Sequence, residues 1–295
     1  MSLHDHYSDP TTAMFEDFAS NGIDPPSTFY FDGKIHRFGK KKRYWYVAHQ
    51  HPIPICVYGD WKFGTKNKYI HRDTNLVTVA DRLLVQKAFE ALEKKRLEDR
   101  EQKHKVAREL AQKLWANAQP AKFHEYLKQK RVLPMDIKVD HHNNLLIPLV
   151  GDEAIQSLQF IQADGTKRFL KNGKTKGMYH AIGLESQPER LLICEGFATG
   201  ATLNMETKTP VIVVFYAANL VPVAKVIRKQ HPHAEILICG DNDHATEGNP
   251  GKTYAINAAR ACGGRWTIPD FHGLTPSPND TDFNDLSRLQ KLAAL

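Results

Sequence analysis

The C-terminal third of the chain alternates short apolar runs with amphipathic segments. The apolar runs predict strands at 191–194, 211–215, 236–240 and 265–268, and the segments between them predict helices at 198–206, 221–229 and 254–261. A short apolar run without alternation is typical of a strand buried on both faces, as in a parallel sheet covered by helices. Successive βα units of this kind are joined by right-handed crossovers. The pattern therefore predicts an α/β fold with a mostly parallel sheet flanked by helices.

The N-terminal region has the pattern of short strands and tight turns. Asp32-Gly33 predicts a hairpin turn between strands at 29–31 and 34–38, and the basic run 40–43 predicts the tip of a second hairpin. Next, residues 79–118 keep helical spacing and predict either one long helix or a broken pair.

Together these patterns predict a chain of five parts. We expect a flexible lead-in over 1–27 with one helical turn near residues 14–18, a small β-rich basic module over 28–75, a long charged helical linker over 76–119, a mixed α+β subdomain over 120–187 and a catalytic domain over 188–295.

Aromatic residues alternate with lysines and arginines in the N-terminal module. Such side chains on a small sheet can stack bases and bind phosphates, or the rings can form the core of the module. Both interpretations stay open, and both can hold for different faces of one sheet. On the first interpretation, the residues that bind DNA are Lys40, Lys41, Lys42, Arg43, Tyr44, Trp45 and Trp61.

Composition adds an uneven charge to this picture. The chain has 295 residues and a net charge of +7, with 24 Lys and Arg against 16 Asp and Glu in residues 1–135, but 16 against 17 in residues 136–295. This asymmetry indicates an N-terminal half that meets polyanions and a C-terminal half with acid-lined chemistry.

Several classes of protein are disfavoured by what the sequence lacks. It has no apolar run of about 18 residues, and its polar start is not a signal peptide, so we expect a cytoplasmic protein with no membrane partner. Its four cysteines form no CxxC pair, so no zinc site is expected. Cys194 and Cys239 lie within apolar runs and are expected to be core thiols.

Acidic residues follow two of the expected parallel strands. Glu195 comes directly after the strand 191–194, and Asp241 and Asp243 follow the strand 236–240. Because ligands bind at the carboxyl ends of parallel strands, we expect these acids to meet at one edge of the sheet. Carboxylates gathered there favour a hard cation such as Mg²⁺.

The order of these motifs resembles the Toprim domain, which primases, topoisomerases and certain nucleases share. Glu195-Gly196 and Asp241-Asn242-Asp243 each end an apolar strand, with βα units between them, and Asp282-Phe283-Asn284-Asp285 follows. Over roughly residues 28–286, with the charged helix as an interruption, the chain resembles Toprim primases of plasmids, prophages and integrative elements. The segments that carry this wider resemblance include Gly165-Thr166-Lys167-Arg168-Phe169-Leu170, Ala217-Ala218-Asn219-Leu220 and Thr281-Asp282-Phe283-Asn284-Asp285-Leu286.

The resemblance implies a Mg²⁺ site, in which Mn²⁺ can substitute, and assigns roles to the acids. It implies Glu195, Asp241 and Asp243 as catalytic residues, with Glu195 either a metal ligand or a general acid/base. The expected metal ligands are Glu195, Asp241, Asp243, Asp282 and Asp285, of which the last two complete a second metal position. The residues expected to contact phosphates of nucleotide or template are Lys128, Lys130, Lys167, Arg168 and Lys171.

The activity that the resemblance implies is that of a DNA primase, a nucleotidyltransferase. It would make short RNA primers on single-stranded DNA from ribonucleoside triphosphates, for replication of a plasmid, phage or mobile element. The sequence has no zinc ribbon, and because it has no Walker motif, a replicative helicase is expected in trans. The alternatives are a Mg²⁺-dependent Toprim nuclease and a non-catalytic, single-stranded-DNA-binding accessory of replication.

Overall fold

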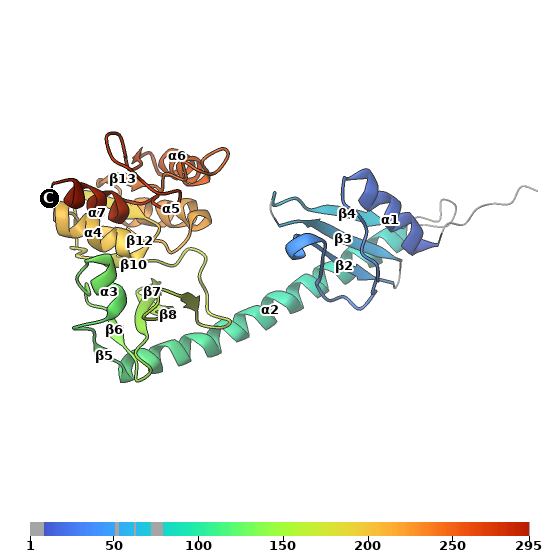
Figure 1. Cartoon of the computed structure of the whole chain (residues 1–295). Coiled ribbons are helices and arrows are strands. Elements are labelled where there is room, and N and C mark those ends of the chain that lie inside the picture. The colour runs from blue at the N-terminus through green and yellow to red at the C-terminus, as the bar shows by residue number, and fades with distance from the viewer. Residues whose placement is uncertain (1–8, 51–52, 62, 72–78, 295) are drawn as a thin grey trace, which may run out of the picture. The chain divides into compact units, whose positions relative to one another are not determined.

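The structure is a computed structural model that describes residues 9–50, 53–61, 63–71 and 79–294. The chain divides into two compact units, Met1–Glu98 and Asp99–Leu295. The division falls inside α2 (Val79–Asn117), which runs as one continuous helix in Figure 1. Of the two alternatives for this segment, the single long helix is therefore correct. Among the described residues, no helix combines the length and the apolar character needed to cross a membrane.

The first unit contains a four-stranded antiparallel sheet in which neighbours in sequence pair in the order β1-β2-β3-β4. The second hairpin predicted from the sequence is confirmed, because Phe38 pairs with Tyr44 on either side of a 3-10 turn. The first predicted hairpin is replaced by an isolated bridge between Asp32 and His49. The elements are α1 (Pro10–Ser20), β1 (His36–Phe38), the turn at Lys40–Lys42, β2 (Tyr44–His49), β3 (Ile55–Asp60) and β4 (Asn67–Ile70).

Helix α1 is longer than the single helical turn expected near residues 14–18 of the flexible lead-in. Asp9 caps its first turn by accepting from the backbone N–H groups of Thr11 and Thr12, at 3.1 and 3.2 Å. Met14 and Phe18 are fully buried in a core with aromatic side chains of β2 and β3. Their burial explains why this segment is ordered. The expected lead-in over residues 1–8, and residues 72–78 at the expected border between module and linker, lie outside the described residues.

The second unit begins with the end of α2 and a five-stranded antiparallel sheet in the order β5-β6-β7-β8-β9. Ala111 and Ala118, in and after the last turns of α2, pack against Leu146 and Phe160 of this sheet. The end of the expected linker helix is thus part of this unit's core. The elements are β5 (Gln119–Pro120), α3 (Glu125–Lys130), β6 (Lys138–Val139), β7 (Leu145–Gly151), β8 (Ala154–Ile161) and β9 (Lys167–Phe169).

A second sheet of this unit has the order β10-β12-β11-β13-β14. The neighbours β12, β11, β13 and β14 are parallel, as the apolar runs predicted, and β10 adds an antiparallel edge. The elements are β10 (His180–Ile182), β11 (Arg190–Cys194), α4 (Phe197–Thr207), β12 (Val211–Val213), a 3-10 turn (Ala217–Asn219), α5 (Leu220–Gln230), β13 (Glu235–Cys239), α6 (Pro250–Cys262), β14 (Arg265–Thr267) and α7 (Phe283–Ala293).

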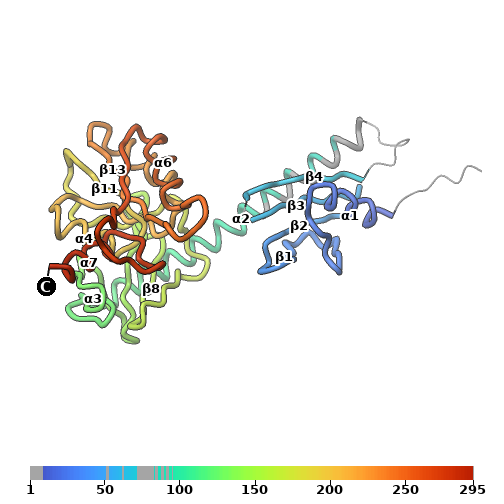
Figure 2. Tube along the Cα trace, turned by 45° about the horizontal axis from the view of Figure 1, so that its top comes forward, coloured from blue at the N-terminus to red at the C-terminus, as the bar shows by residue number. Residues whose placement is uncertain are grey.

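Helices cover both faces of the mostly parallel sheet. Along β11, Leu192 and Cys194 enter the core that contains α4 and α3, whereas Leu191 and Ile193 enter the core that contains α5 and α6. In Figures 1 and 2, α4 and α7 lie side by side, and α6 lies beside β13. Cys194 and Cys239 are buried free thiols, as expected. The core with α4 also contains Leu145 of β7, so one hydrophobic core spans the expected border at residue 187, and that border stays a prediction.

Candidate functional site

The two neighbouring parallel strands β11 and β13 end side by side. Cys194 pairs with Cys239 at their last residues, so Glu195 comes directly after one strand end and Asp241 comes two residues after the adjacent one. The side chains of both acids are partly buried, and the Glu195 Oε1 and Asp241 Oδ1 atoms are buried without a hydrogen-bond partner. The alignment of these strands brings the two acids together, although they are 46 positions apart in sequence.

Burial and repulsion from neighbouring acids both raise the pKa of these two carboxyls. Burial raises the pKa of Glu195 to about 7, and the negative charges of Asp243 and Asp282 add to the rise. Burial likewise raises the pKa of Asp241 to about 8, and repulsion from Glu195 is the largest electrostatic contribution. A carboxyl with a raised pKa lacks partners that favour its charged form. Two such carboxyls at one strand edge form a site that a cation would stabilise.

Asp243 is held differently, at the start of α6. Its Oδ2 atom accepts from the backbone N–H of Gly251 at 2.8 Å, and its own N–H donates to Asn249 Oδ1 at 3.0 Å. A Cβ atom on Gly251 would lie 2.5 Å from the Asp241 carbonyl oxygen, so the helix approaches the acids this closely only with glycine here. One carboxylate oxygen of Asp243 therefore already accepts a hydrogen bond from within the protein.

Asp282 and Asp285 form a capping box at the start of α7. Asp282 Oδ1 accepts from the N–H of Asp285 at 2.9 Å, and Asp285 Oδ2 accepts from the N–H of Asp282 at 3.4 Å. Thr199 of α4 donates its hydroxyl to Asp282 Oδ2 at 2.9 Å. These contacts satisfy exposed N–H groups of the first helical turn and fasten α7 to α4. Both residues, expected as ligands of a second metal, thus have hydrogen bonds within the fold.

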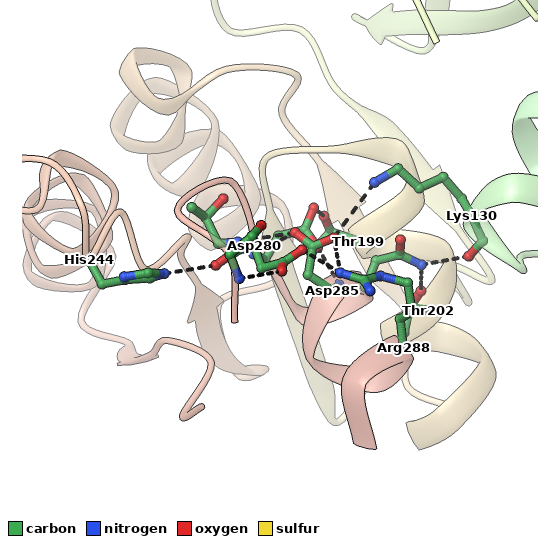
Figure 3. A network of polar contacts seen from close by, with 11 residues as sticks. Lys130, Thr199, Thr202, His244, Asp280, Asp285 and Arg288 are labelled. Atoms are coloured by element: carbon green, nitrogen blue, oxygen red, sulfur yellow. Dashed lines mark hydrogen bonds and ion pairs between the residues drawn. The ribbon is translucent and has the colours of Figure 1, made fainter. Parts of the chain in front are cut away.

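A polar network surrounds this capping box (Figure 3). Asp285 Oδ1 lies 3.9 Å from both Lys130 Nζ and an Arg288 nitrogen, and Arg288 also pairs with Asp280. His244 Nε2 lies 3.1 Å from the Asp280 carbonyl oxygen. The network therefore links α3, α7 and the loop after β13 around the acidic edge.

Comparison with known proteins matches this region to one domain family. The pattern of the Toprim domain matches residues 190–291, the segment that holds β11 to β14 and all five acids. Residues 190–291 form a Toprim domain.

The likeness to known primases extends beyond the Toprim domain. A DNA primase TraC of Escherichia coli is 31% identical over 262 residues, which are 81% of this chain and 24% of that protein. A second DNA primase TraC of Escherichia coli is 34% identical over 168 residues, which are 50% of this chain and 12% of that protein. The chain spans about a quarter or less of the length of these relatives. The expected resemblance to a Toprim DNA primase of the plasmid type is confirmed.

Two solved structures of primases show a distant similarity to this chain. A DnaG primase catalytic domain bound to single-stranded DNA has a TM-score of 0.42 and 12% identity, covering 66% of this chain and 78% of that one. A DNA primase domain from Pseudomonas aeruginosa has a TM-score of 0.34 and 16% identity, covering 54% of this chain and 52% of that one. These likenesses are too distant to carry residue roles across.

The donor atoms of the Toprim domain fit a hard cation at Glu195 and Asp241. Both offer a buried carboxylate oxygen without a partner, and hard cations prefer oxygen ligands. Within the described residues, however, no group of three or more His, Cys, Asp or Glu side chains is arranged to hold a metal ion. The five-ligand set expected from the sequence therefore stays a prediction, with Glu195 and Asp241 as the best-supported donors.

Two of the expected phosphate-binding lysines lie at the acidic edge of the Toprim domain. Lys130 contacts Asp285, as above, and Lys167 Nζ lies 5.8 Å from the centre of the Tyr126 ring. Although Lys167 is exposed as a residue, its ammonium group has protein around it, and this burial, with repulsion from Lys130, lowers its pKa. Attraction to Asp282 and Asp241 acts in the opposite direction, so these acids are near.

The other expected phosphate-binding residues do not all lie on the face of β9 that carries Lys167. Arg168 pairs with Phe160 across β8 and β9, and its guanidinium lies 5.3 Å from that ring. Phe160 belongs to the core that α2 covers, so Arg168 projects from the face of β9 opposite to Lys167. Lys128 and Lys171 are exposed, on α3 and in the turn after β9.

The expected DNA-binding residues of the first unit divide between the two faces of its sheet. Tyr44 packs on the aromatic core, so for this ring the core interpretation applies. Trp45 and Trp61 lie 5.6 Å apart between ring centres, and Trp61 is 52% exposed, with the Arg37 guanidinium 5.2 Å from its ring. Arg43 donates to Asp60 at 2.8 Å, whereas Lys40, Lys41 and Lys42 are exposed at the hairpin tip.

Sequence reasoning missed several polar residues that assemble the site. Tyr126 has a buried hydroxyl without a partner, and its pKa is raised by burial and by Asp282. Asn242 accepts from Asn249 at 2.8 Å and donates its N–H to the Thr281 carbonyl at 2.7 Å, which ties the Asp241 loop to the segment before Asp282. Asn249-Pro250 is a typical signal for the start of a helix. It predicts that α6 begins at Pro250, four residues before the expected start.

The capping box gives a stability prediction for Asp282. Replacing it by alanine removes the N-cap acceptor and the Thr199 bond, so the free energy of unfolding should fall by about 1 kcal/mol. Asp282→Asn keeps a capping oxygen and should cost clearly less, although it removes the charge. Urea denaturation of the two variants measures this difference. Equal losses for both variants would mean that charge, and not capping, gives Asp282 its structural role.

Proposed function

We propose that this chain is the catalytic part of a DNA primase, which joins ribonucleotides on a single-stranded DNA template with Mg²⁺. The observation that supports this most directly is the pair of unpartnered acids, Glu195 and Asp241, at adjacent strand ends beside Lys167. The likeness to TraC primases, which covers 81% of the chain, supports the same reaction class.

In the proposed reaction, the acids would hold Mg²⁺ and the lysines would hold the phosphates of the substrate. The 3′-hydroxyl of one nucleotide attacks the α-phosphorus of a triphosphate, and pyrophosphate leaves. Bound Mg²⁺ would neutralise charge on the phosphoryl group, held by Asp241 and Glu195 with Asp243 nearby. Lys130 and Lys167 lie next to these acids and would hold the phosphate oxygens in place. Glu195 would act either as a metal ligand or as the base that accepts the hydroxyl proton.

Primer synthesis on single-stranded DNA tests this function. The chain is incubated with a single-stranded template, labelled ribonucleoside triphosphates and MgCl₂, with EDTA in a parallel reaction. We expect short, template-dependent RNA products that are absent with EDTA. Cleavage of the template in place of synthesis would identify a Toprim nuclease, and template binding without either reaction would identify a non-catalytic accessory.

We further propose that the first unit binds single-stranded template. On one side of its sheet, Trp61, which follows β3, contacts both the Trp45 ring and the Arg37 guanidinium, and the hairpin tip carries three exposed lysines. Aromatic rings stack on bases of any sequence, and lysines attract the phosphates between them. The Tyr44 side of the same sheet is occupied by the core.

Replacing Lys40, Lys41 and Lys42 together by glutamine tests this assignment in the full chain. If each lysine contacts one phosphate, the slope of log affinity against log salt should become shallower by about 2, since each contact to a single strand contributes about 0.7. Fluorescence anisotropy of a labelled oligonucleotide between 50 and 200 mM salt, as rough limits, measures the slope. An unchanged slope would show that the hairpin tip does not meet the template.

A further inference from the structure

Three aromatic rings gather where β12 ends, beside Glu195. Phe215 and Tyr216 follow β12, and Phe169 ends β9 in the other sheet of the unit. The centre of the Phe169 ring lies 6.0 Å from that of Phe215 and 6.3 Å from that of Tyr216, with both ring pairs close to perpendicular at 77°. We call Phe169, Phe215 and Tyr216 the aromatic cluster. Neither the acids nor the proposed phosphate contacts account for it.

The backbone of Phe215 is held in an unfavourable conformation next to Glu195. Its φ angle is +74°, a left-handed conformation that is rare for a residue with a bulky side chain. The N–H of Phe215 donates to the Glu195 carbonyl oxygen at 2.7 Å, which fixes its position. Such strain is found most often where a site needs a side chain in one place. The backbone that carries the Phe215 ring is therefore held at the backbone of Glu195.

Strand β9 presents a ring and a cation on the same face. Lys167 and Phe169 are two residues apart, so their side chains project from one face at a separation of about 7 Å, while Arg168 projects from the other. The Lys167 ammonium contacts the Tyr126 ring and lies near the acids, whereas the Phe169 ring contacts Phe215 and Tyr216. A ligand along this face would meet a positive charge and then an aromatic surface.

The surroundings of the aromatic cluster are accessible and basic. Phe169 remains 36% exposed. Thr175 Oγ1 lies 3.4 Å from the Tyr216 hydroxyl, and Lys174 and Lys176 flank this threonine. Asn219 holds the same loop, since it accepts from the Gly177 N–H at 2.7 Å and donates to the Met178 carbonyl at 2.9 Å. An apolar surface bordered by cations suits a ligand that is flat and apolar in one part and anionic in another.

We propose that the aromatic cluster is a stacking site for a nucleobase whose phosphate reaches Lys167 and the acidic edge. This deepens the proposed primase function and rests on it. The base belongs either to the template strand or to a ribonucleoside triphosphate, and the chemistry of recognition is the same for both. Because every base has a π face, the site would accept all four.

The test compares Phe169→Leu, which keeps apolar volume but removes the ring, with Phe169→Trp, which keeps an aromatic face. Trp266→Leu is the matched control, because Trp266 is an exposed aromatic residue on β14, which two strands separate from β12. Three quantities are measured on the full chain: affinity for a single-stranded oligonucleotide, affinity for the same strand with abasic sites, and the KM for ribonucleoside triphosphates. Thermal melting of each variant confirms folding.

We expect Phe169→Leu to weaken one base-dependent interaction by about tenfold, as loss of one stacked base does, with Phe169→Trp and Trp266→Leu close to wild type. A weaker affinity for the intact strand but not for the abasic strand places a template base on the aromatic cluster. A higher KM with unchanged strand affinity places the base of the triphosphate there.

If the wild type binds strands and makes primers, and Phe169→Leu leaves both strand affinities and the KM unchanged, the stacking site is wrong but the proposed function stands. An equal loss for intact and abasic strands would also overturn the stacking site, since the ring would then act without a base. A wild-type protein that neither binds strands nor incorporates nucleotides would overturn the proposed function and the inference together.

Discussion

Replacing Glu195 by glutamine is expected to lower nucleotide incorporation by roughly two or more orders of magnitude, which is about 3 kcal/mol of barrier. Glutamine keeps the size of the side chain and its hydrogen-bonding capacity, but it cannot take a negative charge. Glu195 follows a buried strand, and one of its carboxylate oxygens is buried without a partner. The loss is therefore expected whether Glu195 binds metal or accepts a proton.

Incorporation and template affinity are measured on the same preparation of the Glu195→Gln protein. Glu185→Gln, at an exposed glutamate ahead of β11, controls for the chemical change alone. Template affinity should stay close to wild type, since removing a negative charge does not remove a phosphate contact. Normal incorporation would make Glu195 structural, and loss of template binding would place it in the DNA-binding groove.

Replacing Asp241 by asparagine is expected to abolish synthesis and yet to raise the melting temperature of the metal-free protein at pH 8. The buried Asp241 Oδ1 atom has no partner, and the repulsion from Glu195 and Asp282 disappears with its charge. Asp243→Ala should abolish synthesis but lower the melting temperature, because Asp243 accepts from the N–H of Gly251. The two aspartates, only two residues apart, should thus have opposite effects on stability.

The effect of Asp241 on stability has a defined pH dependence. Its pKa is about 8 in the folded protein, above its ordinary value of 3.8, so the folded state binds the proton more tightly than the unfolded state. The stability from this protonation is complete below about pH 4 and is lost as the pH rises to about 8. The metal-free wild type should therefore melt at falling temperatures across this window, and Asp241→Asn should show a shallower fall.

Thermal melts at pH 5 and pH 8, each with EDTA or MgCl₂, measure both effects. A cation that binds only the folded protein raises its stability, so MgCl₂ should raise the melting temperature of the wild type more than that of Asp241→Asn. A lower melting temperature for Asp241→Asn at pH 8 in EDTA would show that the charge of Asp241 stabilises the fold. In that case, the unpartnered acids would not form a cation site.

Local patterns in the sequence were sufficient to predict the parallel sheet and its two acids. Continuous apolar runs identify strands buried on both faces, and a polar residue after each run lies at the carboxyl edge. Glu195 and Asp241 both fit this rule, and β11 and β13 are adjacent as expected. The order of the acidic motifs also sufficed to identify the Toprim domain, now matched at residues 190–291.

Patterns read one segment at a time did not reveal which polar contacts each residue makes. Asp282 and Asp285 have the spacing of a capping box, but the same spacing suits a pair of metal ligands, and only the placement of α7 against Thr199 shows the hydrogen bonds. Arg168 lies beside Lys167 in sequence, yet the register of β9 against β8 puts it over Phe160 on the other face. In the first unit, the lead-in was expected to hold one helical turn near residues 14–18, and it forms the longer helix α1 because its apolar side chains complete an aromatic core.

The sequence by itself determined the candidate acids of this protein, their order along the chain and the strands that carry them. These follow from local periodicity and from residue type, which need no knowledge of distant contacts. Only the tertiary structure decided which acids keep an unpartnered oxygen, that Lys167 lies beside them, and that the ring at the end of β9 meets two rings that follow β12 next to Glu195. Those properties depend on burial and on packing between segments distant in sequence, and no local pattern contains that information.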